Sequence, residues 1–202
     1  MFSLDTCNNE SLRDRLIIRE TVEFERYCRD YGLWSEMKAL FLQGARVRIS
    51  WFDGNCEDFI QRSGNMSGAK HKIYNTVVQV HEDKALAEII AHIQGRQTIE
   101  KAEGDMISYV RLLYRLRRVE ETWKILSIDC IYEKDMFLPL NPDEEWIADA
   151  EKLQQFRESY KYLCYVLSGM GEKINLDLPG EDRPELVRKL YDESFKWLHS
   201  KV

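Results

Sequence analysis

The chain has 202 residues, of which 44% are hydrophobic and 11% aromatic, so it is long and apolar enough to bury one sizeable core. Its formal net charge is −6 at pH 7, which argues against nucleic acid or an anionic membrane surface as a partner, because neutralising phosphates needs a dense basic surface. The five cysteines include no Cys-x-x-Cys pair, so we expect free thiols in a reducing compartment rather than a disulfide framework or a zinc site.

The N-terminal segment and the apolar runs bear on location. Residues 1–15 include Asp5 and Glu10 but no apolar stretch typical of a secretory signal. No apolar run approaches the roughly 18 residues that a membrane span requires. We therefore expect a cytoplasmic protein with no membrane partner.

The first predicted element is a helix over residues 10–31. No proline interrupts this stretch, and Gly32 follows it, where the end of a helix favours a residue without a Cβ. The residues that recur at steps of three and four, and so indicate the helix, are Leu16, Ile17, Glu20, Phe24, Tyr27 and Tyr31.

Shorter elements follow the first helix. A second helix is expected over residues 34–42. Residues 46–51 then alternate between polar and apolar, which is typical of a strand, and residues 52–54 have the chemistry of a turn. Residues 56–62 are sufficient for one or two helical turns.

Four long strands are predicted at residues 70–80, 85–99, 106–119 and 122–132. Short polar turns join them, so neighbouring strands must be antiparallel and form a meander. Each strand exceeds the usual length of about five or six residues, so the sheet must twist and curl strongly. With helices before it, such a sheet forms a half-open cone.

The last third of the chain is predicted to be helical. Pro139 and Pro142 end the sheet, and Asp143 is a plausible N-cap for a helix from residue 144 to about 167. Pro184 stands just inside a final helix that reaches about residue 199.

The order of helices, then strands, then helices predicts the α+β class. We divide the chain into a cone domain, residues 1–138, and a C-terminal helical extension, residues 139–202, packed on the same domain. The two helices of the extension would either cap the mouth of the cone or dock a second subunit, and the sequence leaves both possibilities open.

Several short motifs between roughly residues 10 and 135 match a known family. They are Tyr27 to Trp34 at the end of the first helix, Phe41 with Val47 to Trp51, Lys70-His71, Asp83-Lys-Ala85, and Arg111-x-x-x-Arg115 leading to Thr122 to Ile125. Together they resemble the SnoaL-like branch of the nuclear transport factor 2-like superfamily, with scytalone dehydratase, bile acid dehydratase and ketosteroid isomerase relatives. The resemblance implies a cystatin-like fold, in which N-terminal helices wrap a curved antiparallel sheet around a small-molecule pocket.

The resemblance also implies three catalytic candidates. Scytalone dehydratase-like proteins have an acid–base histidine at the strand start that matches His71, and an imidazole takes and returns a proton near neutral pH. Asp30 would hold the tautomer of His71, and Tyr27, three residues earlier on the same helix, would donate to a carbonyl or enolate oxygen. The structural alternatives are a hydrogen-bonded core histidine, an exposed aspartate at a helix end and a tyrosine that only packs.

Substrate-binding candidates come from the aromatic residues and one arginine. Tyr31, Trp51 and Tyr109 would form apolar walls with polar tips, although packing alone would also account for them. Arg111 lies mid-strand, where an unpaired charge is costly to bury, so it must face water, a carboxylate or an anionic ligand. The spacing of histidines and cysteines fits no metal site, and no cofactor is expected.

Two functions remain open at this point. The first is a cofactor-independent dehydratase or isomerase, in which His71 and Asp30 move a proton on a small hydrophobic or aromatic, oxygenated ligand. The second is a non-catalytic binding or assembly subunit, like the small subunit of ring-hydroxylating dioxygenases. Under either function we expect a homodimer through the outer face of the sheet, because four long strands expose more apolar surface than the predicted helices cover.

Overall fold

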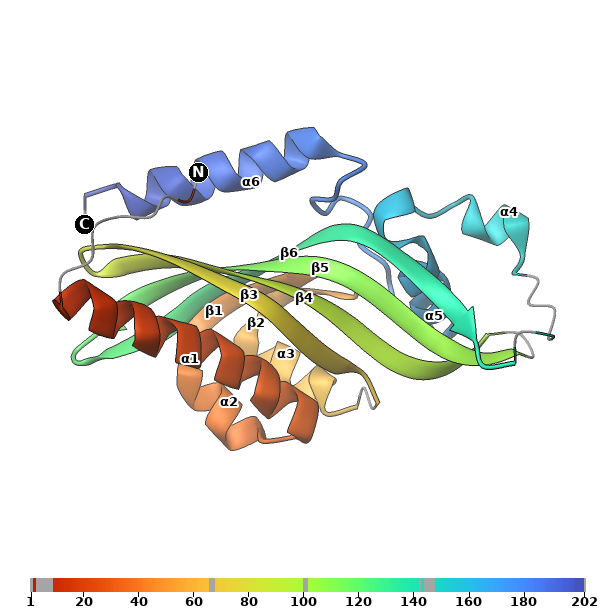
Figure 1. Cartoon of the computed structure of the whole chain (residues 1–202), viewed down its shortest axis with the longest axis horizontal. Helices are drawn as coiled ribbons and strands as arrows, with labels where there is room; N and C mark the ends of the chain where they lie inside the picture. Colours follow the sequence, from red (N-terminus) through yellow and green to blue (C-terminus); the bar gives the residue numbers. More distant parts are fainter. Residues whose placement is uncertain are drawn as a thin grey trace.

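Six strands form one strongly twisted sheet in the order β2-β1-β6-β5-β4-β3 (Figure 1). The computed structural model describes residues 2, 9–65, 68–99, 102–141, 143 and 148–201. Along the chain the elements are α1 (Asn9–Tyr31), α2 (Trp34–Leu40), β1 (Phe41–Ile49), β2 (Phe52–Asn55), α3 (Cys56–Ser63), β3 (Lys70–His81), β4 (Lys84–Ile99), β5 (Ala102–Val119), β6 (Thr122–Pro139), α4 (Ala150–Leu153), η1 (Glu158–Tyr160), α5 (Lys161–Gly169) and α6 (Pro184–Leu198).

Strands β3 to β6 form the predicted antiparallel meander. Strand β1 adds to it in parallel with β6, but pairs only with residues between Ile125 and Asp129. The second half of β6 therefore has one edge free of β1. The predicted α+β class, with a curved sheet and N-terminal helices, is confirmed.

Several stretches of strand were not predicted. Strand β1 begins at Phe41, within the predicted second helix, and β5 begins at Ala102, before its predicted start at residue 106. Residues 52–55 form the short strand β2 rather than a turn, because they pair with residues 46–49 of β1. Strand β6 continues to Pro139, well beyond the predicted end at residue 132. The charged residues Glu133, Lys134 and Asp135 hide this continuation in the sequence, but pairing with the start of β5 sustains it.

The predicted helix over residues 144–167 is wrong as a single element. Residues 144–147, which include Trp146, lie outside the described residues. Asp149 caps α4, since its side chain accepts from the backbone N–H groups of Glu151 and Lys152. Arg157 is extended, with φ −81° and ψ 143°, and separates α4 from η1 and α5.

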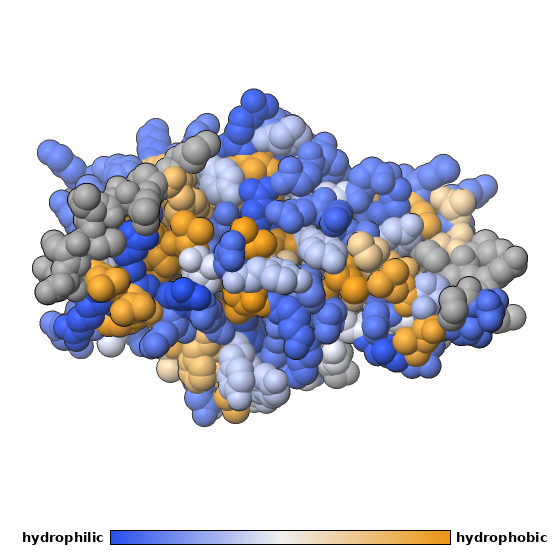
Figure 2. Space-filling model, in the orientation of Figure 1, coloured by the Kyte–Doolittle hydropathy of each residue, from blue (hydrophilic) through white to orange (hydrophobic). Residues whose placement is uncertain are grey.

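Helix α1 does not pack on the sheet through the face that carries the periodic aromatic residues used to predict it. Ile18, Val22 and Cys28 are fully buried, whereas Phe24 and Tyr27 are 42% and 50% exposed. Figure 2 shows hydrophobic residues at the surface on the side of the molecule that carries α1. The buried face also holds charged residues, described below, and this composition conceals it from a hydrophobicity pattern.

The two main helices of the extension lie on opposite faces of the sheet (Figure 1). Helix α5 packs on β5 and β6, in a cluster with Met106 and Phe137. Helix α6 covers part of the other face, where Leu190 packs with Leu113 and Ile131. The predicted homodimer assumed that this outer face is uncovered, and α6 now covers part of it; dimerisation itself stays a prediction.

Between α5 and α6 the chain crosses from one face to the other along the free edge of β6. The backbone N–H of Tyr132 donates to Pro179 at 3.0 Å, and the N–H of Glu181 donates to Tyr132 at 2.9 Å. The ring of Tyr160 stacks on that of Tyr132 with centroids 4.3 Å apart. These contacts attach the crossing segment to the strand that carries part of the cavity wall.

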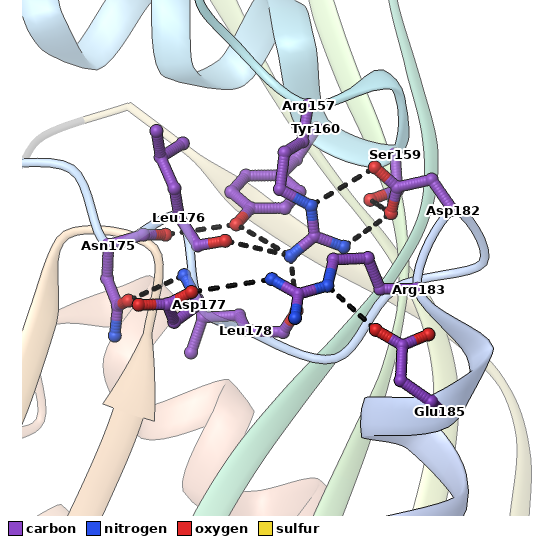
Figure 3. Close-up of polar contacts among 10 residues, drawn as sticks. All are labelled: Arg157, Ser159, Tyr160, Asn175, Leu176, Asp177, Leu178, Asp182, Arg183 and Glu185. Atoms are coloured by element: carbon purple, nitrogen blue, oxygen red, sulfur yellow. Dashed lines mark hydrogen bonds and ion pairs between the residues drawn. The ribbon is translucent and has the colours of Figure 1, made fainter.

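Arg157 organises the crossing segment (Figure 3). Its guanidinium pairs with the Asp182 carboxylate, with Nε 3.1 Å from Oδ2. Its Nη1 donates to the carbonyl of Leu176 at 2.9 Å and also to the carbonyl of Leu178. One side chain that precedes α5 therefore fixes the path that leads to α6.

Candidate active site

A cavity of about 470 Å³ lies between the concave face of the sheet, the C-terminal end of α1 and helix α5. This volume is in the range of small-molecule sites. Its apolar walls come from the sheet and α5, through Ile49, Trp51, Ile93, Met106, Leu112, Leu163, Val166, Leu167 and Met170. The extension thus forms part of the cavity wall.

His71 and Asp30 meet at the wall of this cavity. His71 is the second residue of β3 and Asp30 is in the last turn of α1. Nδ1 of His71 lies 2.6 Å from Oδ1 of Asp30, and the backbone N–H of His71 donates to Oδ2 at 2.6 Å. The side chains are 2% and 7% exposed, so water barely competes for these bonds.

The environment keeps the imidazole neutral and the carboxylate charged. Burial, first, and then the positive charges of Arg26 and Arg29 lower the pKa of His71 to about 4, although Asp30 opposes the shift. Burial alone would raise the pKa of Asp30, but its hydrogen bonds with His71 hold it below the ordinary value. An ionised carboxylate only accepts hydrogen bonds, so Nδ1 carries the proton and Nε2 has a free lone pair.

A buried ion pair supports this dyad. Arg26 and Glu25 are neighbours on α1, with Nε of Arg26 2.5 Å from Oε2 of Glu25. The hydroxyl of Tyr114, on β5, donates to the same oxygen at 3.0 Å. Burial disfavours the charge of Arg26, but Glu25 holds the pKa of Arg26 above its ordinary value. Its Nη1 lies 3.5 Å from Nε2 of His71, so a cationic donor reaches the reactive nitrogen.

Two further arginines line the cavity. Arg62, on α3, forms an ion pair with Glu172, which follows α5, and its guanidinium lies 5.5 Å from the ring centroid of Trp51. This pair joins the cone to the extension at the cavity. Arg29, one turn of α1 beyond Arg26, lines the cavity as well.

Of the predicted site residues, the structure places His71 and Trp51 in the lining of the cavity, and Asp30 is bonded to His71. Tyr27 and Tyr31 do not line it. They are 50% and 62% exposed, and their rings pack on each other on the outer side of α1, with centroids 4.5 Å apart. On an α-helix, Tyr27 points about 60° away from Asp30, which lies three positions later. This difference in direction is enough to place Tyr27 on the solvent side of α1.

Tyr109 and Arg111 lie on the opposite face of the sheet. The ring of Tyr109 packs against His92, with Lys134 over it. Arg111 pairs with Glu133 at 3.0 Å and with Glu181, so carboxylates at the α6 face answer its charge. The predicted placement of these two side chains in a pocket is therefore wrong.

Sequence reasoning missed the buried polar residues of α1. Arg26 and Asp30 are four residues apart and share one face of α1, and Arg29 lines the cavity together with Arg26. The i, i+4 spacing of Arg26 and Asp30 was the sequence feature that could have revealed this face. The aromatic residues of the other face drew the prediction away from it. Tyr132 was also missed; its hydroxyl accepts from the backbone N–H of Ser50 at 2.8 Å.

Metal ligation finds no support in the described part of the chain, where no three His, Cys, Asp or Glu side chains are grouped for a metal ion. Among the described helices, none has the length and apolar character needed to cross a membrane.

Comparison of the sequence with known proteins identifies the family of this chain. The model of the SnoaL-like domain matches residues 10–129. A PEP2-like protein of Fusarium vanettenii is 30% identical over 200 residues, covering 92% of this chain and 85% of that protein. The chain belongs to the SnoaL-like family. Pea pathogenicity protein 2 of the same fungus is 29% identical over 178 residues, covering 84% of this chain and 76% of that protein.

Solved structures agree on the fold of this SnoaL-like chain. A candidate scytalone dehydratase from Novosphingobium aromaticivorans has a TM-score of 0.53 at 20% identity, covering 66% of this chain and 97% of its own. A hexachlorocyclohexane dehydrochlorinase from Novosphingobium barchaimii has a TM-score of 0.52 at 14% identity, covering 68% and 97%. At these identities the likeness to solved structures shows the fold alone. The predicted family resemblance is confirmed by the match to the SnoaL-like domain.

The extent of the match differs between the two kinds of relative. The solved structures are almost fully covered, whereas about a third of this SnoaL-like chain lies outside each match. The match to the PEP2-like protein covers 92% of the chain and leaves out fewer residues than the extension contains. This match therefore reaches into the extension that contributes α5 to the cavity wall.

Proposed function

We propose that this protein is a cofactor-independent lyase or isomerase that moves a proton on a small, mostly apolar, oxygenated substrate. The observation that carries the proposal is the Asp30–His71 pair at the cavity wall. Its geometry supports a neutral imidazole with Nδ1 bonded to a carboxylate and Nε2 free to accept a proton.

In the proposed reaction, Nε2 of His71 takes a proton from a carbon next to a carbonyl group. Asp30 stabilises the imidazolium that forms, as a carboxylate at hydrogen-bond distance does in a low-dielectric site. In a dehydration, the electron pair forms a carbon–carbon double bond, hydroxide leaves from the next carbon, and the imidazolium returns its proton to give water. In an isomerisation, the proton returns to a different carbon.

The enolate oxygen needs a donor, and Tyr27 lies outside the cavity. Arg26 is the candidate, because its Nη1 is next to Nε2 of His71 while its other nitrogens bind Glu25. A fixed cation at the developing negative charge is the arrangement that lowers the barrier of such reactions. Arg26 would therefore fill the role that the sequence assigned to the tyrosine.

The alternative of a non-catalytic assembly subunit predicts a cone filled by side chains and a free outer face. The cavity of about 470 Å³ and the position of α6 favour the pocketed protein instead. The homodimer and the cytoplasmic location remain proposals alongside this one.

The test uses 2-tetralone, a flat apolar ketone, and follows exchange of its α-protons in D₂O by NMR. We expect exchange faster than in buffer alone, and a fall of roughly 10²-fold or more in His71→Asn, since general base catalysis contributes about 10²–10⁴-fold. Asp192→Asn, an exposed change on α6, is the control for a nonspecific effect. Equal rates in the wild type and His71→Asn would contradict the proposal.

A further inference from the structure

Arg29 is a charged group of the cavity that the proposed chemistry leaves unused. It lies in the last turn of α1, lines the cavity and is partly buried. Burial, first, and the neighbouring Arg26 lower its pKa to about 10, so the guanidinium still carries its charge at neutral pH.

The other charges of the cavity wall are each answered by a neighbour. Arg26 binds Glu25, and Asp30 binds the imidazole and the backbone of His71. The third pair, between α3 and the segment after α5, joins Arg62 to Glu172.

Arg29 differs from these groups. Within the described part of the chain its guanidinium makes no hydrogen bond and no ion pair, and the carboxylates of Glu25 and Asp30 act on it only through space. A guanidinium has five N–H donors in a planar fork. These donors line the cavity and are available to an acceptor that the described residues do not supply.

We propose that Arg29 binds the anionic end of the substrate, and that the substrate is a largely apolar carboxylic acid that also carries a carbonyl group. This inference rests on the proposed function of the same cavity. A carboxylate matches the planar fork of a single guanidinium in a two-point contact. A phosphate would need further free donors, whereas the neighbouring Arg26 and Arg62 are already paired.

The remainder of the wall fits the other end of such a molecule. Trp51, Leu112, Leu163 and Leu167 offer apolar surface. Because Arg29 and Asp30 are adjacent on α1, an acid held by Arg29 would have its body along the wall that carries His71. Arg29 would thereby position the substrate, while His71 performs the proton transfer.

The experiment compares two fluorescent probes that differ by one group. 8-Anilinonaphthalene-1-sulfonate carries an oxyanion, and N-phenyl-1-naphthylamine is the same molecule without it. Both are titrated against the full chain, Arg29→Gln, Arg29→Lys and the control Arg19→Gln. Arg19 is on the same helix but exposed, and it contacts only Glu23 among the described residues.

We expect the wild type to bind the sulfonate at least tenfold more tightly than the neutral probe, since a charge-assisted hydrogen bond is stronger than a neutral one. Arg29→Gln should lose that preference while it keeps its affinity for the neutral probe. Arg29→Lys should retain part of the preference, and Arg19→Gln all of it.

Three outcomes would overturn the assignment. One is an unchanged sulfonate affinity in Arg29→Gln, as expected if the probe binds the exposed aromatic surface of α1. Another is an equal loss of both probes in Arg29→Gln and Arg29→Lys, which would make Arg29 structural. The third is a wild type without any preference.

Binding of the probes does not require turnover, so the two proposals fail separately. A sulfonate preference that depends on Arg29, without α-proton exchange that depends on His71, would refute the reaction and leave the anion site. The reverse result would refute the anion site and leave the reaction.

Discussion

Oδ1 of Asp30 lies 2.6 Å from Nδ1 of His71, although 41 positions separate these residues in the chain. Asp30→Asn keeps the size of the side chain but removes the charge that stabilises an imidazolium. We expect at least a tenfold lower rate of 2-tetralone exchange, with an unchanged circular dichroism spectrum. Exchange at the wild-type rate would show that the carboxylate has no part in the reaction.

The pH dependence of exchange tests the buried state of the imidazole. With a pKa lowered to about 4, the basic form of His71 persists well below pH 6.5, so the rate should stay level and fall only near pH 4. A depressed histidine pKa also means that the folded state resists protonation. Its stability should therefore decline as the pH falls from about 6.5 towards 4. A rate that already halves at pH 6.5 would contradict this environment.

The position of Tyr27 outside the cavity can be tested against the hypothesis from the sequence that its hydroxyl takes part in the reaction. Tyr27→Phe removes only a hydroxyl at a half-exposed site. We expect an exchange rate within about twofold of the wild type. By contrast, Arg26→Gln should lower it by about 10²-fold, which is typical for loss of an oxyanion donor. A large effect of Tyr27→Phe would place its phenol at the reaction after all.

Asp135 is a buried carboxyl on β6 that holds the start of α5. Its Oδ2 accepts from the backbone N–H of Leu163 at 2.8 Å, while Oδ1 is buried without a hydrogen bond among the described residues. Burial raises the pKa of Asp135 to about 6. The charged form is therefore disfavoured in the folded state, and its cost grows as the pH rises from about 4 to 6.

Asp135→Asn should accordingly stabilise the protein at neutral pH, because the amide keeps an acceptor and carries no charge. We expect a gain of roughly 1–3 kcal/mol in the free energy of unfolding at pH 7.5 and little difference at pH 4, measured by urea denaturation. Asp192→Asn, at the surface, should show no such pH dependence. A destabilised variant at pH 7.5 would refute this account.

Arg157 joins the segment before α5 to the segment before α6 (Figure 3). Arg157→Gln removes the donor of two carbonyl groups and leaves Asp182 with the Ser159 hydroxyl. We expect a loss of about 1.5–3 kcal/mol in the free energy of unfolding, the usual contribution of hydrogen bonds to a charged group. Arg188→Gln on the exposed side of α6 is the matched control, and equal stabilities of the two variants would count against the role of Arg157.

The long strands and the first helix could be predicted because their signals are local. Alternation and short polar turns mark β3 to β5 closely, and the period of residues 10–31 marks α1. His71 at the start of a strand and Asp30 at the end of a helix followed from the family resemblance, and the structure brings the two together.

The inner face of α1 could not be predicted from hydrophobicity. Glu25 and Arg26 are buried because they pair with each other and with Tyr114, which lies far along the chain. A hydrophobicity pattern counts charged residues as exposed and therefore assigns the wrong face of α1 to the core. That pattern left Arg26 and Arg29 out of the predicted site, whereas Tyr27 entered it through the family resemblance and its spacing from Asp30.

The sequence by itself determined the first and last helices, the four long strands with their antiparallel order, and the family, because each depends on neighbours a few residues apart. Only the tertiary structure decided which side of α1 faces the cavity and how the extension divides between the two faces of the sheet. Both depend on pairings between distant residues, such as Arg111 with Glu181 and Tyr132 with Pro179. Such pairings offset the free-energy cost of burying a polar group, and they exist only once the fold has formed.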